Sequence, residues 1–268
     1  MASPAVFATD CDNGTPGQTQ CAGALTPGAN GTAVGNAANA SGSNSSAVGN
    51  GAQATNTNTS AFGNGAIASG AYATAVGSLA AASGANSSAF GNQATASGAF
   101  ASAFGNLALA SGANSTAVGN NARATNTGAT ALGDGAFANG TSTTAVGQNA
   151  IANGNNDSVF GQGAIAQTGT GAAVNGASVF GQNAKALSNN ATVVGQNAIA
   201  NGTGTTVMSV AVGNRSTAGV TGNLGTALSG DVAIGAYATA TDPNVDKYLV
   251  IATGTPSTDP TSGPSMPA

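Results

Sequence analysis

The chain has 268 residues, only 4% of them charged, and carries a net charge of −4 without any His or Glu. Because phosphate binding needs several Lys or Arg on one face, this composition argues against nucleic acid and anionic lipid as partners. Catalysis and metal binding need titratable groups held together, so we expect no enzymatic activity, no cofactor and no metal.

The first 30 residues precede the periodic part of the chain, and we expect them to form an N-terminal cap. They lack the basic region and long apolar stretch of a secretory signal. No part of the chain approaches the roughly 18 consecutive apolar residues of a membrane span, so no direct membrane insertion is expected. Cys11 and Cys21 lie in turn-rich sequence without metal-ligand companions. This setting favours a disulfide, and hence an extracytoplasmic location, over two free thiols.

A Gly preceded by a small apolar pair recurs through residues 31–241 with a 14-residue period. The period is strict from Gly35 to Gly161, and four more such Gly follow after gaps of 20, 14, 18 and 22 residues. Each unit contains two short alternating segments, such as 108–110 and 116–118, separated by turn-forming residues. Two strands of about five residues and two tight turns account for one unit. The pattern predicts an all-β parallel β-solenoid (β-roll) of about 14 coils.

The residue immediately before each of these Gly is large and apolar, and the one before that is nearly always Ala. Neighbours in a strand point to opposite faces, and so short a coil has a very thin interior. We therefore expect the Ala columns, including those three and five places after each Gly, to face inward. The large apolar column then faces outward as a stripe, which consists of Val34, Val48, Phe62, Val76, Phe90, Phe104, Val118, Leu132, Val146, Phe160, Phe180, Val194, Val212 and Ile234.

Such a long apolar stripe is not normally left exposed by an isolated soluble chain. The stripe therefore predicts a cyclic homo-oligomer of parallel rods, with the stripe at its axis.

Three insertions interrupt the period, between Gly161 and Gly181, between Gly195 and Gly213, and between Gly213 and Gly235. Insertions in repeat proteins map to loops that often bind ligands, and tolerated variation near the end of the rod is the alternative.

These repeats resemble the head repeats of trimeric autotransporter adhesins, the YadA-like head repeats. The resemblance covers about residues 31–240 and is carried by Ser-Val-Ala-Val-Gly at 209–213, Val-Ala-Ile-Gly at 232–235 and the recurring Ser/Thr-Ala-Val/Phe-Gly-Asn-x-Ala-x-Ala-x-Gly. It implies a left-handed parallel β-roll, a homotrimer, and an extracellular position at the bacterial outer membrane on a stalk and anchor outside this chain. Residues 251–259 are similar to the neck of such adhesins. We therefore expect 242–268 to be a neck-like segment and Pro-rich tail, with an ordinary Pro-rich tail as the alternative.

The predicted function is a cell-surface adhesin head that attaches, through an unknown ligand, to host matrix, cells or abiotic surfaces, as in virulence. A ligand-free structural fibre or phage-type spike segment fits the same sequence. An ice-binding solenoid is a third alternative, but the regular Thr-x-Thr ladder that it requires does not recur in every coil. Collagen binding is linked in the family to a large apolar residue three places before the Gly, and this position is usually Ser or Thr here. With few titrating groups, stability should vary little with pH.

Overall fold

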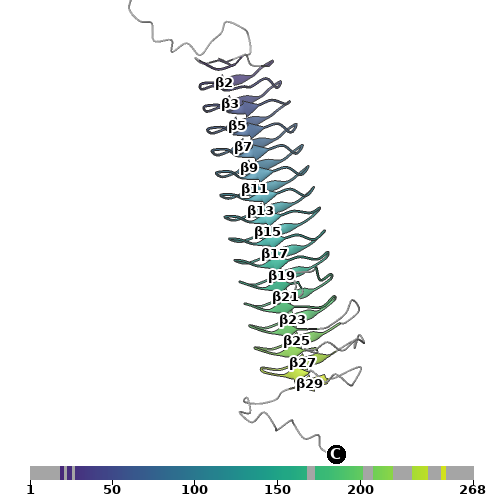
Figure 1. Cartoon of the computed structure of the whole chain (residues 1–268). Helices are drawn as coiled ribbons and strands as arrows, with labels where there is room; N and C mark the ends of the chain where they lie inside the picture. Colours follow the sequence, from purple (N-terminus) through teal and green to yellow (C-terminus); the bar gives the residue numbers. More distant parts are fainter. Residues whose placement is uncertain are drawn as a thin grey trace, which may run out of the picture.

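The chain folds into a parallel β-solenoid whose coils stack into an elongated rod (Figure 1). The computed structural model describes residues 19–20, 23–25, 28–167, 173–201, 208–219, 231–240 and 249–251. Cys11, Cys21 and all of residues 242–268 except Leu249–Ile251 lie outside these described residues. The predicted disulfide and neck therefore stay predictions.

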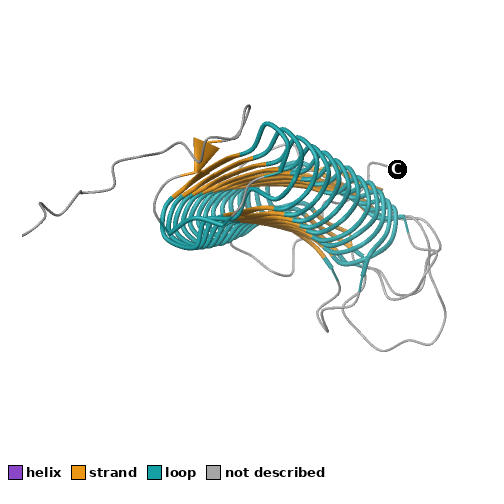
Figure 2. Cartoon of the chain, turned by 90° about the horizontal axis from the view of Figure 1, so that it is seen from above, coloured by secondary structure: helices purple, strands orange, loops and turns teal. Residues whose placement is uncertain are grey.

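Each coil contributes one strand to each of two sheets, which face each other across a narrow interior when the rod is seen from above (Figure 2). Sheet A has 16 strands and sheet B has 13, which corresponds to about 13 turns, close to the predicted number.

Sheet A comprises β1 (Thr19–Gln20), β2 (Thr32–Val34), β3 (Ser46–Val48), β5 (Ser60–Phe62), β7 (Thr74–Val76), β9 (Ser88–Phe90), β11 (Ser102–Phe104), β13 (Thr116–Val118), β15 (Thr130–Leu132), β17 (Thr144–Val146), β19 (Ser158–Phe160), β21 (Ser178–Phe180), β23 (Thr192–Val194), β25 (Val210–Val212), β27 (Val232–Ile234) and β29 (Leu249–Ile251). Sheet B comprises β4 (Gln53–Ala54), β6 (Ile67–Ala68), β8 (Ala81–Ala82), β10 (Thr95–Ala96), β12 (Leu109–Ala110), β14 (Arg123–Ala124), β16 (Phe137–Ala138), β18 (Ile151–Ala152), β20 (Ile165–Ala166), β22 (Lys185–Ala186), β24 (Ile199–Ala200), β26 (Thr217–Ala218) and β28 (Thr239–Ala240).

The two strands per coil were predicted correctly, but their predicted length of about five residues is wrong. The strands have two or three residues, as in β11 and β12. The reason is that each coil turns two tight corners, at 105–107 and 112–114 in this example, and these corners take up much of the 14-residue unit.

The strands pair in parallel with equivalent residues in register, as Ser102 with Thr116. This register survives all three insertions, where Ser158 pairs with Ser178, Thr192 with Val210, and Val210 with Val232. In each case the extra residues fall between a sheet B strand and the next sheet A strand. The insertions therefore leave both sheets continuous.

The interior consists of the Ala columns, as predicted. In the coil that begins at β11, Ala103, Ala108 and Ala110 are all buried. Val replaces Ala at a few places in the sheet A column, as at Val159 and Val179, which are also fully buried. Small side chains let the two sheets approach each other closely enough to exclude water.

Candidate functional site

The outward face of sheet A carries two parallel columns, because the first and third residues of each strand point outward and the middle residue inward. The first column is mostly Ser or Thr, and the second is the apolar stripe. Seven stripe residues keep 37–44% of their surface exposed, namely Phe62, Phe104, Leu132, Phe160, Phe180, Val194 and Ile234. The other seven are partly exposed.

Neighbouring side chains of the stripe pack on one another along the rod. The rings of Phe90 and Phe104 are stacked with centroids 5.0 Å apart, and those of Phe160 and Phe180 with centroids 5.2 Å apart. Since this stacking already removes part of each side chain from water, assembly would bury only the remainder. Burying that remaining surface would stabilise an oligomer by about 1 kcal/mol per large side chain.

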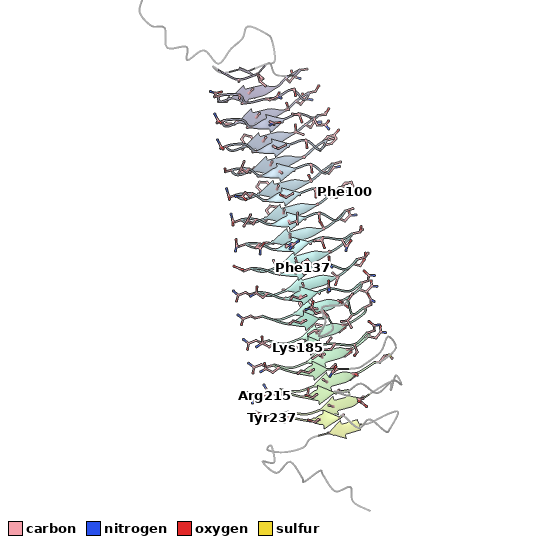
Figure 3. All side chains as sticks on the ribbon, in the orientation of Figure 1. Phe100, Phe137, Lys185, Arg215 and Tyr237 are labelled. Atoms are coloured by element: carbon pink, nitrogen blue, oxygen red, sulfur yellow. The ribbon has the colours of Figure 1, made fainter. Side chains whose placement is uncertain are left out.

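Sheet B presents a single outward column, four places after each Gly, which sequence analysis did not single out. It mixes apolar residues such as Ile151 and Phe137 with Gln53, Arg123 and Lys185. The guanidinium of Arg123 lies 5.2 Å from the centre of the Phe137 ring, and Figure 3 labels Phe137 and Lys185 on this part of the rod. No strand of sheet A contains a charged residue. Because buried surfaces between proteins are depleted of charge, sheet A is the better candidate for an interface.

The corners of the rod hold their last residue, such as Leu107 or Asn114, in the left-handed region, and Asn or Gly occupies most of these positions. Large apolar exceptions are Tyr72, Leu79, Phe100, Leu107 and Tyr237, with φ between 58° and 62°. Each costs about 1–2 kcal/mol relative to an unstrained backbone. All five are exposed. Sequence reasoning missed these positions, although their Asn and Gly neighbours in the repeat signalled the corner conformation.

The corners also carry side-chain amide ladders. The Nε2 of Gln162 donates to Gln148 at 2.7 Å, that of Gln182 to Gln162 at 2.9 Å, and that of Gln196 to Gln182 at 2.7 Å. Such in-register bonds link successive coils and leave this edge polar.

Asp157 is a buried carboxylate in a column that holds Ser or Thr in several other coils, such as Ser115. Its two oxygens accept hydrogen bonds at 2.9 Å from the backbone N–H groups of Gly154 and Ala177. Ala177 follows the six-residue insertion, so Asp157 links the corner of its own coil to the chain that returns after the insertion. Burial raises the pKa of Asp157 to about 6, against the N–H groups of Ala177, Gly154 and Gly176, which lower it.

The raised pKa of Asp157 predicts a pH dependence that the expectation of pH-independent stability overlooked. Between about pH 4 and pH 6 the Asp157 carboxyl group is deprotonated in the unfolded chain but stays protonated in the folded chain. The stability of the fold therefore falls as the pH rises. The free energy of unfolding should drop by about 3 kcal/mol across this window. Thermal unfolding should therefore have a higher midpoint at pH 4 than at pH 7. The variant Asp157→Ser should lose this difference, and an equal or lower midpoint at pH 4 in the parent chain would contradict the prediction.

Within the described part of the chain, no group of three or more His, Cys, Asp or Glu is arranged to hold a metal ion. Over the same residues, no helix has the length and apolar character needed to cross a membrane.

Comparison with known families agrees with this geometry. The family model described as "YadA head domain repeat (2 copies)" matches residues 27–52, 54–80, 82–108, 110–136, 138–164 and 175–198. Together these segments are more than half of the chain, and most of them span two coils of the solenoid. No curated protein matches the chain in sequence.

Proposed function

This chain belongs to the YadA head family, and we propose that it forms a parallel homotrimer with the outward faces of sheet A around the three-fold axis. The observation that carries this proposal is the contrast between the two faces. Sheet A presents an unbroken apolar stripe without charge, while sheet B presents Arg123 and Lys185 to solvent. Assembly around sheet A covers the stripe and keeps both charged side chains in water.

In this trimer the rod acts as an adhesin head at the cell surface, carried above the outer membrane by a stalk. Sheet B and the corners are the surfaces left to contact host matrix, host cells or abiotic material. The repeat presents similar groups in successive coils, and the three-fold symmetry triples them. Individually weak contacts then add up to firm attachment through avidity.

An attachment assay tests the adhesive role. Bacteria displaying this head on a trimeric stalk are compared with bacteria displaying the stalk alone, on polystyrene, on glass and on a host-cell monolayer. We expect attachment to fall about tenfold or more without the head on at least one surface, since avidity multiplies weak contacts. The purified head should compete for the same surface. If bacteria with and without the head attached equally well to each of the three surfaces, the ligand-free fibre would be favoured instead.

A further inference from the structure

The two corners that flank a sheet A strand carry matched residues in two coils. We call the corner before the strand the leading corner and the one after it the trailing corner. Tyr72 and Leu79 flank β7, and Phe100 and Leu107 flank β11, all in the left-handed conformation. Phe100 and Tyr72 are 60% exposed, Leu79 is 54% exposed and Leu107 is 46% exposed.

From β2 to β23, large apolar residues occupy both corners of a coil or neither. The coil between the two matched coils carries Asn86 and Gln93, and the other coils from β2 to β23 carry only Asn, Gly, Ser or Ala at these positions. Beyond β23 the trailing corners carry Arg215 and Tyr237. Next to β25 the exposed Met208 lies opposite Arg215. The leading and trailing corners lie at opposite edges of the rod. Figure 3 shows Phe100 at one edge and the trailing-corner residues Arg215 and Tyr237 at the other. Contact within one chain therefore does not explain the match.

A cyclic homotrimer brings these edges together. Rotation about an axis parallel to the rods keeps each residue at its own height and sets the leading corner of one subunit beside the trailing corner of the next. Tyr72 then lies beside Leu79 of the partner subunit, and Phe100 beside Leu107 of the partner subunit. Each pair brings together two exposed apolar side chains. Both members of each pair have a left-handed backbone conformation, in which Asn would be less strained.

We propose that these two pairs are inter-subunit contacts that fix the register of the trimer, an inference that rests on the proposed homotrimer. The stripe alone distinguishes registers poorly, because nearly every coil offers a Val or Phe. A slip of one coil, in contrast, sets Tyr72 against Gly65 or Gln93 and leaves both pairs unmatched. A non-repeating contact of this kind selects one alignment among many similar ones.

Cysteine cross-linking tests the register. In a Cys11→Ser, Cys21→Ser background, Tyr72→Cys is combined with Leu79→Cys, with Gly65→Cys or with Gln93→Cys, and each chain is oxidised and run on a denaturing gel. We expect covalent trimers for the Leu79→Cys combination and little linkage for the other two. Stronger linkage with Gly65→Cys or Gln93→Cys, or none in a chain that is trimeric by mass, would overturn the contact and leave the homotrimer standing. A monomeric mass for the parent chain would overturn both.

A second test removes one corner pair and measures the dissociation of the trimer. The double variant Phe100→Asn, Leu107→Asn keeps the corner conformation, since Asn occupies it in many coils. If the pair contacts a partner, the concentration at which trimers dissociate should rise about tenfold or more. The control Gln93→Asn, in the coil between, should leave it unchanged. An unchanged or lower dissociation concentration for the double variant would show that the pair makes no stabilising contact with a partner and would overturn the proposal.

Discussion

A chain carrying Phe104→Asp should fold but fail to assemble. Phe104 is 39% exposed in the single chain, so a carboxylate there keeps contact with water and the coil tolerates it. In the proposed trimer the same position comes close to the three-fold axis, where three unpaired carboxylates would be buried together. Each uncompensated buried charge costs about 3–5 kcal/mol. Mass measurement in solution at micromolar concentration should show a trimer for the parent chain and a monomer for the variant.

Leu109→Asp is the matched control for that experiment. Leu109 lies in the same coil, five residues later, and points outward from sheet B. The change in chemistry is similar, but it falls on the face that we propose to be exposed, so the trimer should persist. Dissociation by Leu109→Asp with assembly retained in Phe104→Asp would show that sheet B, and not sheet A, forms the interface.

Gly105→Ala should destabilise the solenoid itself. Gly105 has φ of 136°, and a Cβ on it would lie 2.3 Å from the carbonyl oxygen of Gly119 in the next coil. Because van der Waals contact requires about 3.5 Å or more, the two backbones would have to separate. The strands β11 and β13, which pair at this point, would be forced apart with them. We expect a loss of about 3 kcal/mol or more, or about 10 °C in thermal midpoint.

Gly51→Ala is the corresponding control at a corner with room for a side chain. Gly51 has φ of 64°, and a Cβ there would meet nothing within 4 Å. Ala37 occupies the equivalent position one coil earlier with φ of 55°. The change should therefore cost only about 1 kcal/mol, the strain of the left-handed conformation. Equal losses for the two variants would show that close backbone approach does not limit the Gly105 column.

Much of the fold follows from the sequence because it rests on local rules repeated many times. The 14-residue spacing sets the length of a coil, and alternation within a strand decides that Ala103 points inward while Phe104 points outward. The same logic overestimated the strand lengths. Periodicity reports which residues share a face, but it does not report how many residues a corner needs.

Other features depend on residues that meet only after the coils stack. The buried carboxyl group of Asp157 accepts a hydrogen bond from the backbone N–H of Ala177, which the chain places beside it only after the insertion. The matched corners Tyr72 with Leu79 and Phe100 with Leu107 are seven residues apart in sequence, and only the solenoid sets them at opposite edges.

The sequence by itself thus determined the repeat, the β-solenoid and the inward and outward columns, since these depend on spacing and alternation along the chain. Only the tertiary structure decided that the two outward faces differ in charge, that a carboxyl group is buried and that apolar corner residues occur in pairs. The buried carboxyl group depends on contacts between successive coils, and the other two features depend on the position of each residue around the rod, which a linear pattern does not contain.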